Sequence, residues 1–390
     1  MAGLHPRAAL GNAAMLTVND GWSVLQPAGG DASAAVLFAT CKEHREALRA
    51  AVFSENPLLV RGWDLRHVSH AEHLIFEALG LGKMEIYPRW FISFNERCER
   101  LGVAPGGLVQ KRLSRNAPDA APRTMQPPHV EFGLGPHRPR VASFFCEVPP
   151  AADGETALFS FPRALELLAP ELRRLLHTHG WWTSRSGTVQ PATLRHPETG
   201  LEGLQLYAFS HGLTALCLDA YQRARAAERP DLPLVDRIVY SGPDSEGLTL
   251  VTGDGRKVPL GERRTVQLYR AMFGATRLHT WRQGDVLLFD NVLFGHARMP
   301  GRQPRLLHAI FAEEIDTRAL RPASAPACVH AAAARKSKGA VAITLSQLGP
   351  GGWWIILATV MLFPDWCFQI FGRLLWAVNT SGNRKLGYAS

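Results

Sequence analysis

Four His-x-Glu triplets occur in the sequence, at residues 44–46, 70–72, 129–131 and 196–198. Two histidines and one carboxylate on the same face of a metal ion form the ligand set of non-haem Fe(II) oxygenases. In a β-strand, residues i and i+2 point to the same face, so a His-x-Glu triplet on a strand can supply two of the three ligands. On a helix the two side chains point in nearly opposite directions. The triplet therefore indicates a metal site only where the chain is extended.

Only one of the four triplets has that context. The residues around His44 and His70 follow helical patterns, and His196-Pro-Glu198 has the composition of a turn. His129-Val-Glu131 lies between a loop and a region rich in strand signals. We therefore take His129 and Glu131 as candidate metal ligands.

A third ligand follows a later strand. Residues 284–291 form a glycine turn and a short apolar run that leads to His296. The candidate catalytic and metal-binding set is therefore His129, Glu131 and His296. From the pattern alone, unrelated polar residues remain the alternative.

Motifs around this triad give the sequence a family likeness. These motifs are His129-Val-Glu131, Phe144-Phe-Cys-Glu-Val-Pro-Pro150, Asp153-Gly-Glu-Thr156, Trp281-Arg-Gln-Gly-Asp-Val-Leu-Leu-Phe-Asp-Asn291, His296-Ala-Arg-Met-Pro300 and Arg305, with weaker ones at Val60-Arg-Gly62 and Thr252-Gly-Asp-Gly255. On these motifs, the sequence over roughly residues 35–315 resembles the taurine dioxygenase and clavaminate synthase-like oxygenases, which depend on 2-oxoglutarate.

The resemblance implies an α+β fold with a double-stranded β-helix (jelly roll) core and flanking helices. It implies Fe(II) held by the His129, Glu131 and His296 triad, with 2-oxoglutarate as co-substrate. It also implies that Thr156 and Arg305 bind the distal carboxylate of 2-oxoglutarate. Arginine offers a planar, charged fork for a carboxylate, and a threonine hydroxyl can donate a further hydrogen bond.

Two departures from the family pattern concern arginines. Arg305 follows His296 more closely than is usual, so Arg298 and Arg302 stay open as alternatives for the co-substrate role. A second arginine often stands four residues after the first, and here that position is Ala309. Substrate recognition is therefore open, with a small amino acid, a lipid-linked acyl chain and a protein side chain all candidates. Because Glu131 is present, hydroxylation, desaturation or a related oxidation is favoured over halogenation.

The elements that would position these residues are short. Helical patterns cover Cys41–Val52, Ser69–Leu81 and Arg163–His179, and strand patterns follow Asn56 and cover Val141–Val148, Ala157–Phe161, Val286–Phe289 and Leu306–Ala312. Residues 100–128 form a basic loop rich in proline and glycine. Many short strands with a few helices indicate a β-sandwich or jelly roll.

Composition and charge bound the remaining possibilities. The chain has 390 residues, 46% of them hydrophobic and 20% charged, which excludes a disordered chain, a collagen and a coiled coil. The net charge is +9, but eight basic residues and one acid follow Asp316, so most of the charge belongs to the C-terminal part. We expect an N-terminal segment (1–34), an oxygenase-like domain (35–316), a basic Ala/Pro-rich linker (317–340) and an apolar tail (341–390).

The tail has an ambiguous relation to membranes. Trp353–Val378 is apolar, but Asp365, Gln369 and Arg373 form one polar stripe if the segment is a single helix. Its apolar residues favour insertion by about 4–7 kcal/mol, and the two charges cost about 5–7 kcal/mol. An interfacial helix pair bent at Pro364, a tilted span and a segment packed on protein all stay open. We expect residues 341–378 to associate with a membrane surface or a membrane protein partner.

The six cysteines are scattered without a CxxC pair, which favours reduced thiols in an intracellular protein. The start of the chain has Arg7 and no acid before Asp20, which is compatible with an organelle such as the mitochondrion. The function expected is an Fe(II)- and 2-oxoglutarate-dependent dioxygenase that oxidises a small or lipid-linked substrate and releases succinate and CO2. The alternative is a non-catalytic accessory subunit of a membrane complex. The nearly neutral core excludes nucleic acid as a partner.

Overall fold

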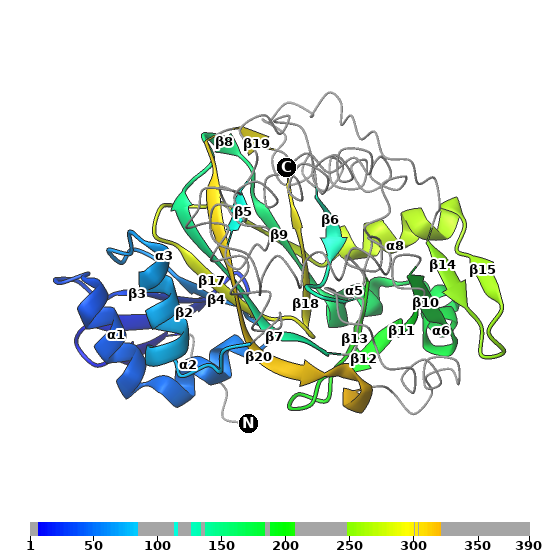
Figure 1. Cartoon of the computed structure of the whole chain (residues 1–390), viewed down its shortest axis with the longest axis horizontal. Helices are drawn as coiled ribbons and strands as arrows, with labels where there is room; N and C mark the ends of the chain where they lie inside the picture. Colours follow the sequence, from blue (N-terminus) through cyan, green and yellow to red (C-terminus); the bar gives the residue numbers. More distant parts are fainter. Residues whose placement is uncertain are drawn as a thin grey trace, which may run out of the picture.

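The computed structural model describes residues 7–84, 113–115, 126–133, 137–183, 188–206, 248–299, 301–302 and 304–320. Over these ranges the protein is a mixed α/β structure built on two large sheets (Figure 1). The basic loop expected at 100–128, apart from its described residues, and the tail at 341–390 lie outside these ranges.

The larger sheet has eight described strands in the order β1-β2-β3-β4-β17-β7-β20-β5. Its strands are β1 (Arg7–Leu10), β2 (Ala14–Asn19), β3 (Trp22–Pro27), β4 (Leu58–Val60), β17 (Val286–Asp290), β7 (His137–Val148), β20 (Leu306–Asp316) and β5 (Leu113–Arg115). The smaller sheet has the order β16-β9-β18-β6, with β16 (Thr276–His279), β9 (Thr156–Ser160), β18 (Phe294–Arg298) and β6 (Gln126–His129).

Three further sheets and a set of helices complete the described part of the chain. A further four-stranded sheet joins β11 (Thr188–Pro191), β10 (Gly180–Thr183), β14 (Thr249–Val251) and β15 (Lys257–Pro259), and two-stranded pairs join β12 (Thr193–Arg195) to β13 (Glu202–Leu204) and β19 (Gly301–Arg302) to β8 (Ala152–Asp153). The helices are α1 (Ala34–Glu43), α2 (Arg45–Val52), α3 (Val68–Glu72), the π-helical η1 (His73–Ala78), α5 (Phe161–Leu167), α6 (Pro170–Thr178), α8 (Glu262–Gly274) and the short 3-10 helix η3 (Thr317–Leu320).

The two large sheets pack face to face through one apolar cluster. Phe144 of β7, Phe289 of β17 and Leu307 of β20 meet Leu158 of β9 and Phe294 of β18 in it. Alternate residues of β7 point the other way, so Phe145 belongs to a second cluster on the outer side of the larger sheet. A strand covered on both faces is apolar at consecutive positions, which explains the continuous run in its sequence.

Helices cover the outer faces of both sheets. Leu37 of α1, Leu48 of α2 and Leu74 of η1 pack against the larger sheet, and each is fully buried. On the smaller sheet, Phe159 meets residues of α5 and α8, including Leu268. Full burial of each such side chain contributes about 1.5–3 kcal/mol, so these helices fix the sheets in place.

The expected strands are confirmed, except that Phe161, predicted to end a strand, begins α5. Strands β7, β17 and β20 extend beyond the apolar runs that predicted them. The helix Cys41–Val52 was predicted as one element and is wrong in that respect, because the chain breaks at His44 (φ −105°, ψ 26°). Arg45 at the start of α2 donates to the carbonyls of Glu77 and Ala78, at 2.8 and 3.0 Å. These contacts with the end of η1 accompany the new direction of α2.

The helix predicted over Arg163–His179 is also two helices. It breaks between α5, which ends at Leu167, and α6, which begins at Pro170. Proline has no amide hydrogen, and its ring disfavours helical geometry in the residue before it. Ala169 accordingly has φ −54° and ψ 141°, outside the helical region.

No helix within the described ranges is both long and apolar enough to cross a bilayer. Residues 341–378, for which membrane association was predicted, are not among those ranges, so that association stays a prediction. Residues 317–320, at the start of the expected linker, form η3, in which Thr317 and Leu320 are buried.

Both cysteines in the described part of the chain, Cys41 and Cys146, are free and buried. Burial raises the pKa of each thiol to about 12, so both are protonated at neutral pH. A protonated thiol is a poor nucleophile and a poor metal ligand. These two residues fit the expected reduced state.

A buried carboxylate joins the early and late parts of the larger sheet. The Asp285 side chain, which is 1% exposed, accepts two hydrogen bonds from Arg61, at 2.9 and 2.6 Å. It also accepts the backbone N–H of Arg282 at 2.8 Å, and His279 Nε2 lies 3.3 Å away. Arg61 follows β4 and Asp285 precedes β17, so the ion pair locks the register of these neighbouring strands.

We predict that Asp285→Asn lowers the free energy of unfolding by about 3 kcal/mol at pH 7, because it leaves the Arg61 guanidinium half-buried without its carboxylate. Urea denaturation of the two proteins measures this difference. The control is Asp316→Asn, which removes a more exposed ion pair with Arg318 and should cost about 1 kcal/mol or less. An equal loss in both variants would contradict the prediction.

The loss should depend on pH in one direction. Burial alone would raise the pKa of Asp285, but hydrogen bonds and charge from Arg61 and His279 outweigh it and hold the pKa below its ordinary value. The stabilisation is therefore present above the unfolded pKa of about 3.9 and is lost as the pH falls through the lower folded pKa. Wild type and Asp285→Asn should converge in strong acid.

Candidate active site

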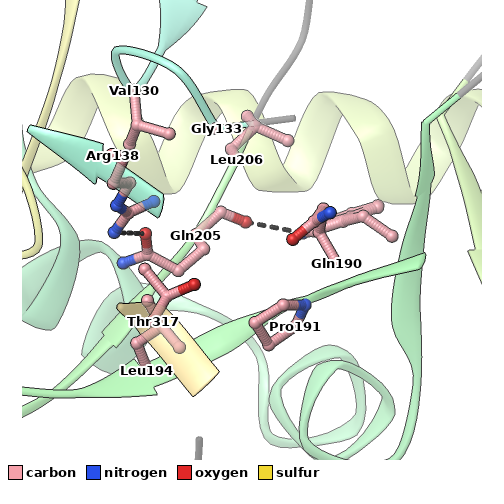
Figure 2. A pocket seen from close by; sticks show the side chains of 10 residues that line it. Val130, Gly133, Arg138, Gln190, Pro191, Leu194, Gln205, Leu206 and Thr317 are labelled. Carbon is pink, nitrogen blue, oxygen red and sulfur yellow. Dashed lines mark hydrogen bonds between the residues drawn. The ribbon is translucent and has the colours of Figure 1, made fainter. Parts of the chain in front are cut away.

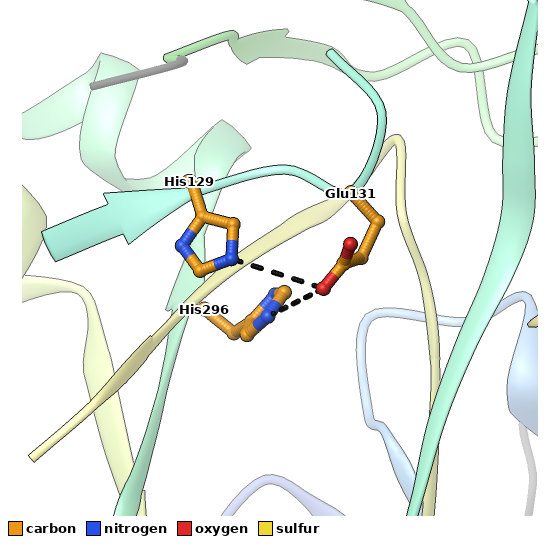
Figure 3. Close-up of side chains that lie close together, drawn as sticks. All are labelled: His129, Glu131 and His296. Atoms are coloured by element: carbon orange, nitrogen blue, oxygen red, sulfur yellow. Dashed lines mark ion pairs between the residues drawn. The ribbon is translucent and has the colours of Figure 1, made fainter. Parts of the chain in front are cut away.

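Three side chains converge between the two large sheets (Figure 3). His129 is the last residue of β6 and His296 lies on β18, and the two are direct partners across the antiparallel ladder. Glu131 follows two residues after β6. Its Oε1 atom lies 3.2 Å from His296 Nε2 and 3.8 Å from His129 Nε2. One ligand atom from each residue lies within 4.8 Å of the others.

Burial sets the protonation of this cluster. The side chains of His129 and His296 are 3% and 5% exposed, and that of Glu131 is 20% exposed. Burial, with repulsion from His129, lowers the pKa of His296 to about 4. Burial alone would raise the pKa of Glu131, but hydrogen bonds with the two histidines outweigh it and hold the pKa well below its usual range. At neutral pH the cluster thus offers a neutral His296 and a carboxylate, the forms that bind metal.

Aromatic rings surround His296. The ring of Phe144 packs edge-on at 5.0 Å between centroids, and that of Phe289 lies at 5.6 Å. The two histidine rings lie 4.2 Å apart. These contacts fix the imidazoles and place a low-dielectric wall beside the candidate ligands.

The other three His-x-Glu triplets form no such cluster, and His129, Glu131 and His296 are the one group of this kind among the residues described. His44 lies between α1 and α2, and His70 lies in α3. His196 is buried, but its Nε2 pairs with Asp290 at 3.0 Å and its Nδ1 accepts the N–H of Thr199 at 3.1 Å. The turn predicted after His196 is confirmed.

A row of polar residues crosses the smaller sheet two residues beyond His296 along β18. Thr156 of β9 is the direct partner of Arg298 on β18 and of His279 on β16. Its Oγ1 accepts a hydrogen bond from the indole N–H of Trp281 at 3.1 Å. Because that bond uses a lone pair of the hydroxyl, the Thr156 O–H proton can be donated to another group.

Arg305 lies just before β20 and is 7% exposed. Burial lowers its pKa to about 9, and the positive charge of nearby Arg298 contributes. The positive charges of a buried Arg305 and a partly buried Arg298 would together favour binding of an anion. Arg302, the other alternative from the sequence, is exposed on β19.

An apolar surface flanks the cluster on the side of the larger sheet. Ala309 and Phe311 of β20 are partly buried and pack on the apolar cluster that lies between the two large sheets. Ala309 is the direct partner of Phe144, which contacts His296. The ring of Phe311 meets that of Phe132, the residue after Glu131, at 5.6 Å. This side of the candidate site has no charged side chain among these residues.

A separate small cavity is lined by Val130 and Arg138 (Figure 2). Arg138 Nη2 donates to Gln205 Oε1 at 2.7 Å, and burial lowers the pKa of Arg138 to about 10. The cavity volume is about 20 Å³, which suits a water molecule but not an organic substrate. The cavity is lined by none of the three candidate metal ligands.

Trp281 is buried, with 4% of its surface exposed. The sequence motifs did not indicate its hydrogen bond with Thr156. The available signal was its place at the start of the motif that ends at Asn291, combined with the general need of a buried indole N–H for an acceptor.

Comparison with known proteins identifies the family. A family model described as taurine catabolism dioxygenase TauD, TfdA family, matches residues 25–311. No curated protein matches this sequence.

This chain is similar to solved structures of low sequence identity. PvcB from Pseudomonas aeruginosa is 17% identical, with a TM-score of 0.50, and the match covers 81% of this chain and 96% of that one. A taurine dioxygenase from Burkholderia xenovorans is 15% identical, with a TM-score of 0.43 and coverage of 80% and 96%. Because the family model spans most of the sequence, this chain belongs to the TauD, TfdA family of dioxygenases, whose cofactors are Fe(II) and 2-oxoglutarate.

Proposed function

We propose that this protein is an Fe(II)- and 2-oxoglutarate-dependent oxygenase in which His129, Glu131 and His296 hold the iron. The observation that carries the proposal is the convergence of two imidazole Nε2 atoms on one carboxylate oxygen in a buried place. Two imidazole nitrogens and one carboxylate oxygen suit Fe(II), and three ligands leave coordination positions open.

When bound, Fe(II) would supply O2 activation coupled to conversion of 2-oxoglutarate into succinate and CO2, with oxidation of the substrate. The protein's own part is binding and orientation. The Arg305 guanidinium would pair with the distal carboxylate of 2-oxoglutarate, and the Thr156 hydroxyl would donate a hydrogen bond to it. Trp281 would hold that hydroxyl in the donating orientation. Phe144 and Phe289 would exclude water from the side of His296.

Arg298 is proposed as an additional positive charge near the same carboxylate. Its position opposite Thr156 and its effect on the pKa of Arg305 support this role. Arg302 is exposed, which favours a solvated surface arginine over a co-substrate ligand.

We further propose that the two facing sheets form the jelly roll of the family, with α1, α2, η1, α5 and α8 as its flanking helices. The shared apolar cluster between the sheets and the helical cover on both outer faces support this arrangement. The strands β1–β3 extend the larger sheet beyond the expected domain start at residue 35.

The substrate is proposed to present an apolar group to the site from the β20 side. Phe132, Ala309 and Phe311 support this, because an anionic substrate would find no countercharge among them. No observation within the described ranges favours the accessory-subunit alternative.

We predict that the metal-free full-length protein binds one Co(II), used as a stable substitute for Fe(II), and that Glu131→Ala weakens binding by about 100-fold or more. Calorimetric titration measures the affinity. The matched control is Glu72→Ala, from a His-x-Glu triplet on a helix, which should leave the affinity unchanged. Equal binding by wild type and Glu131→Ala would contradict the ligand assignment.

We also predict Fe(II)-dependent release of succinate from 2-oxoglutarate, with stimulation by apolar compounds in a substrate screen that includes lipids. The double variant His129→Ala, Glu131→Ala should lose this release, because it removes two of three proposed ligands. Equal turnover by the double variant, or turnover without iron, would show that the proposed function is wrong.

Trp281→Phe should raise the dissociation constant for 2-oxoglutarate about 5-fold in the Co(II)-loaded protein, as expected for loss of one hydrogen bond worth about 1 kcal/mol. The matched control is Trp181→Phe, since the Trp181 indole N–H donates to the Gln205 carbonyl, away from the proposed site. If both variants bind 2-oxoglutarate like wild type, Trp281 has no role in orienting Thr156.

A further inference from the structure

Glu131 differs from the two histidines in how its backbone is held. His129 and His296 lie on paired strands, but β6 ends at His129, and Glu131 follows in a turn. The next residue, Phe132, has a φ of 54°, a left-handed conformation that is unusual for a residue with a side chain of this size. Regular ladder hydrogen bonds therefore do not hold the carboxylate in place.

The side chain of Asn291 supplies the missing bonds. Its Oδ1 accepts the backbone N–H of Glu131 at 3.1 Å, and its Nδ2 donates to the backbone carbonyl of the same residue, also at 3.1 Å. The carboxamide thus pairs with both polar groups of the Glu131 backbone, as a neighbouring strand would. Nδ2 also donates to the carbonyl of Pro139 at 2.8 Å, which ties the turn to β7.

Asn291 is itself rigidly placed. It is fully buried, and its own N–H donates to the carbonyl of Arg140 at 2.6 Å. The preceding Asp290 accepts the N–H of Val292 at 2.7 Å and pairs with Arg140 and His196 through its other oxygen. The end of β17 is therefore a fixed support from which the Asn291 side chain reaches Glu131.

We propose that Asn291 is a positioning residue that holds the backbone of Glu131 so that its carboxylate meets the two histidines. The inference rests on the proposed function of Glu131 as an iron ligand. None of these hydrogen bonds uses the Glu131 carboxylate, so the clamp would hold the Glu131 backbone whether or not metal is bound, and such pre-organisation would lower the entropy lost on binding.

The chemistry requires a carboxamide. Asparagine offers one acceptor to the Glu131 N–H and a donor group with two hydrogens to the carbonyls of Glu131 and Pro139. Aspartate would keep the acceptor but would turn a second oxygen toward two carbonyl oxygens, which is repulsive. Alanine would remove all three bonds and leave the buried backbone groups without these partners.

The test uses the full chain with Asn291→Ala and Asn291→Asp. The first measurement is hydrogen exchange of the peptide that contains residues 130–133 in the metal-free protein. The second is the affinity for Co(II) and the shape of its visible absorption bands, which report ligand geometry. Ser143→Ala is the matched control, because it removes a buried side-chain hydrogen bond to the Ile310 carbonyl, and Ser143 alternates on β7 with Phe144, the residue that contacts His296. Leu48→Ala, in the cluster under α2, controls for lost stability alone.

Both Asn291 variants should speed exchange at residues 130–133, weaken Co(II) binding about 10- to 100-fold and alter the absorption bands. The two controls should lower the melting temperature without these changes. Unchanged exchange at residues 130–133 in a folded Asn291 variant would overturn the clamp. If wild type binds no Co(II), the proposed function fails, but the exchange measurement still decides whether Asn291 holds the Glu131 backbone.

Discussion

The register of the ladder β6-β18-β9 is the constraint on which the candidate site depends. It makes His129 and His296 direct partners, and two residues further along it makes Arg298 the partner of Thr156. All four side chains belong to the face that looks toward the larger sheet. Because side chains alternate across a strand, a slip of one residue would turn each of them to the opposite face. The candidate metal cluster and the proposed co-substrate row are therefore consequences of one strand pairing.

The register is held by apolar packing rather than by the polar groups themselves. Leu158 and Phe294 flank the site residues on β9 and β18 and pack against Phe144 and Phe289 from the larger sheet. Burial of these side chains is favourable, and burial of the ionisable ones is not, as the lowered pKa values of His296 and Arg305 show. The apolar shell thus stabilises the fold and at the same time makes the site receptive to a cation at one end and an anion at the other.

Hydrogen bonds from the residues at both ends of β17 fix neighbouring segments whose positions apolar packing alone does not determine. Asp285 at the start of this strand binds Arg61, and Asn291 just after its end binds the backbone of Glu131. One short buried strand thereby connects the end of the neighbouring strand β4 with the turn that carries the Glu131 carboxylate. The helices that are interrupted at Pro170 and at His44 cover the outer faces of the two sheets.

The sequence by itself determined the residue types and the local elements. Apolar runs located β7, β17 and β20, and a His-x-Glu triplet outside helical context, with a distant histidine after a buried strand, identified the cluster that the structure brings together. Local patterns predict these strands and this triplet because each signal lies within a few consecutive residues. The break between α5 and α6 was equally local, since Pro170 is visible in the sequence, although the leucine-rich pattern concealed it.

Only the tertiary structure decided which distant groups meet. The hydrogen bond from Trp281 to Thr156, the effect of the Arg298 charge on Arg305 and the hydrogen bonds of Asn291 with Glu131 each involve residues from different elements or loops. The sequence placed Glu131 on a strand face, whereas the structure places it in a turn, held by a side chain 160 positions away. Such contacts depend on strand order and register, which result from packing over the whole core and leave no periodic trace in the residues that make them.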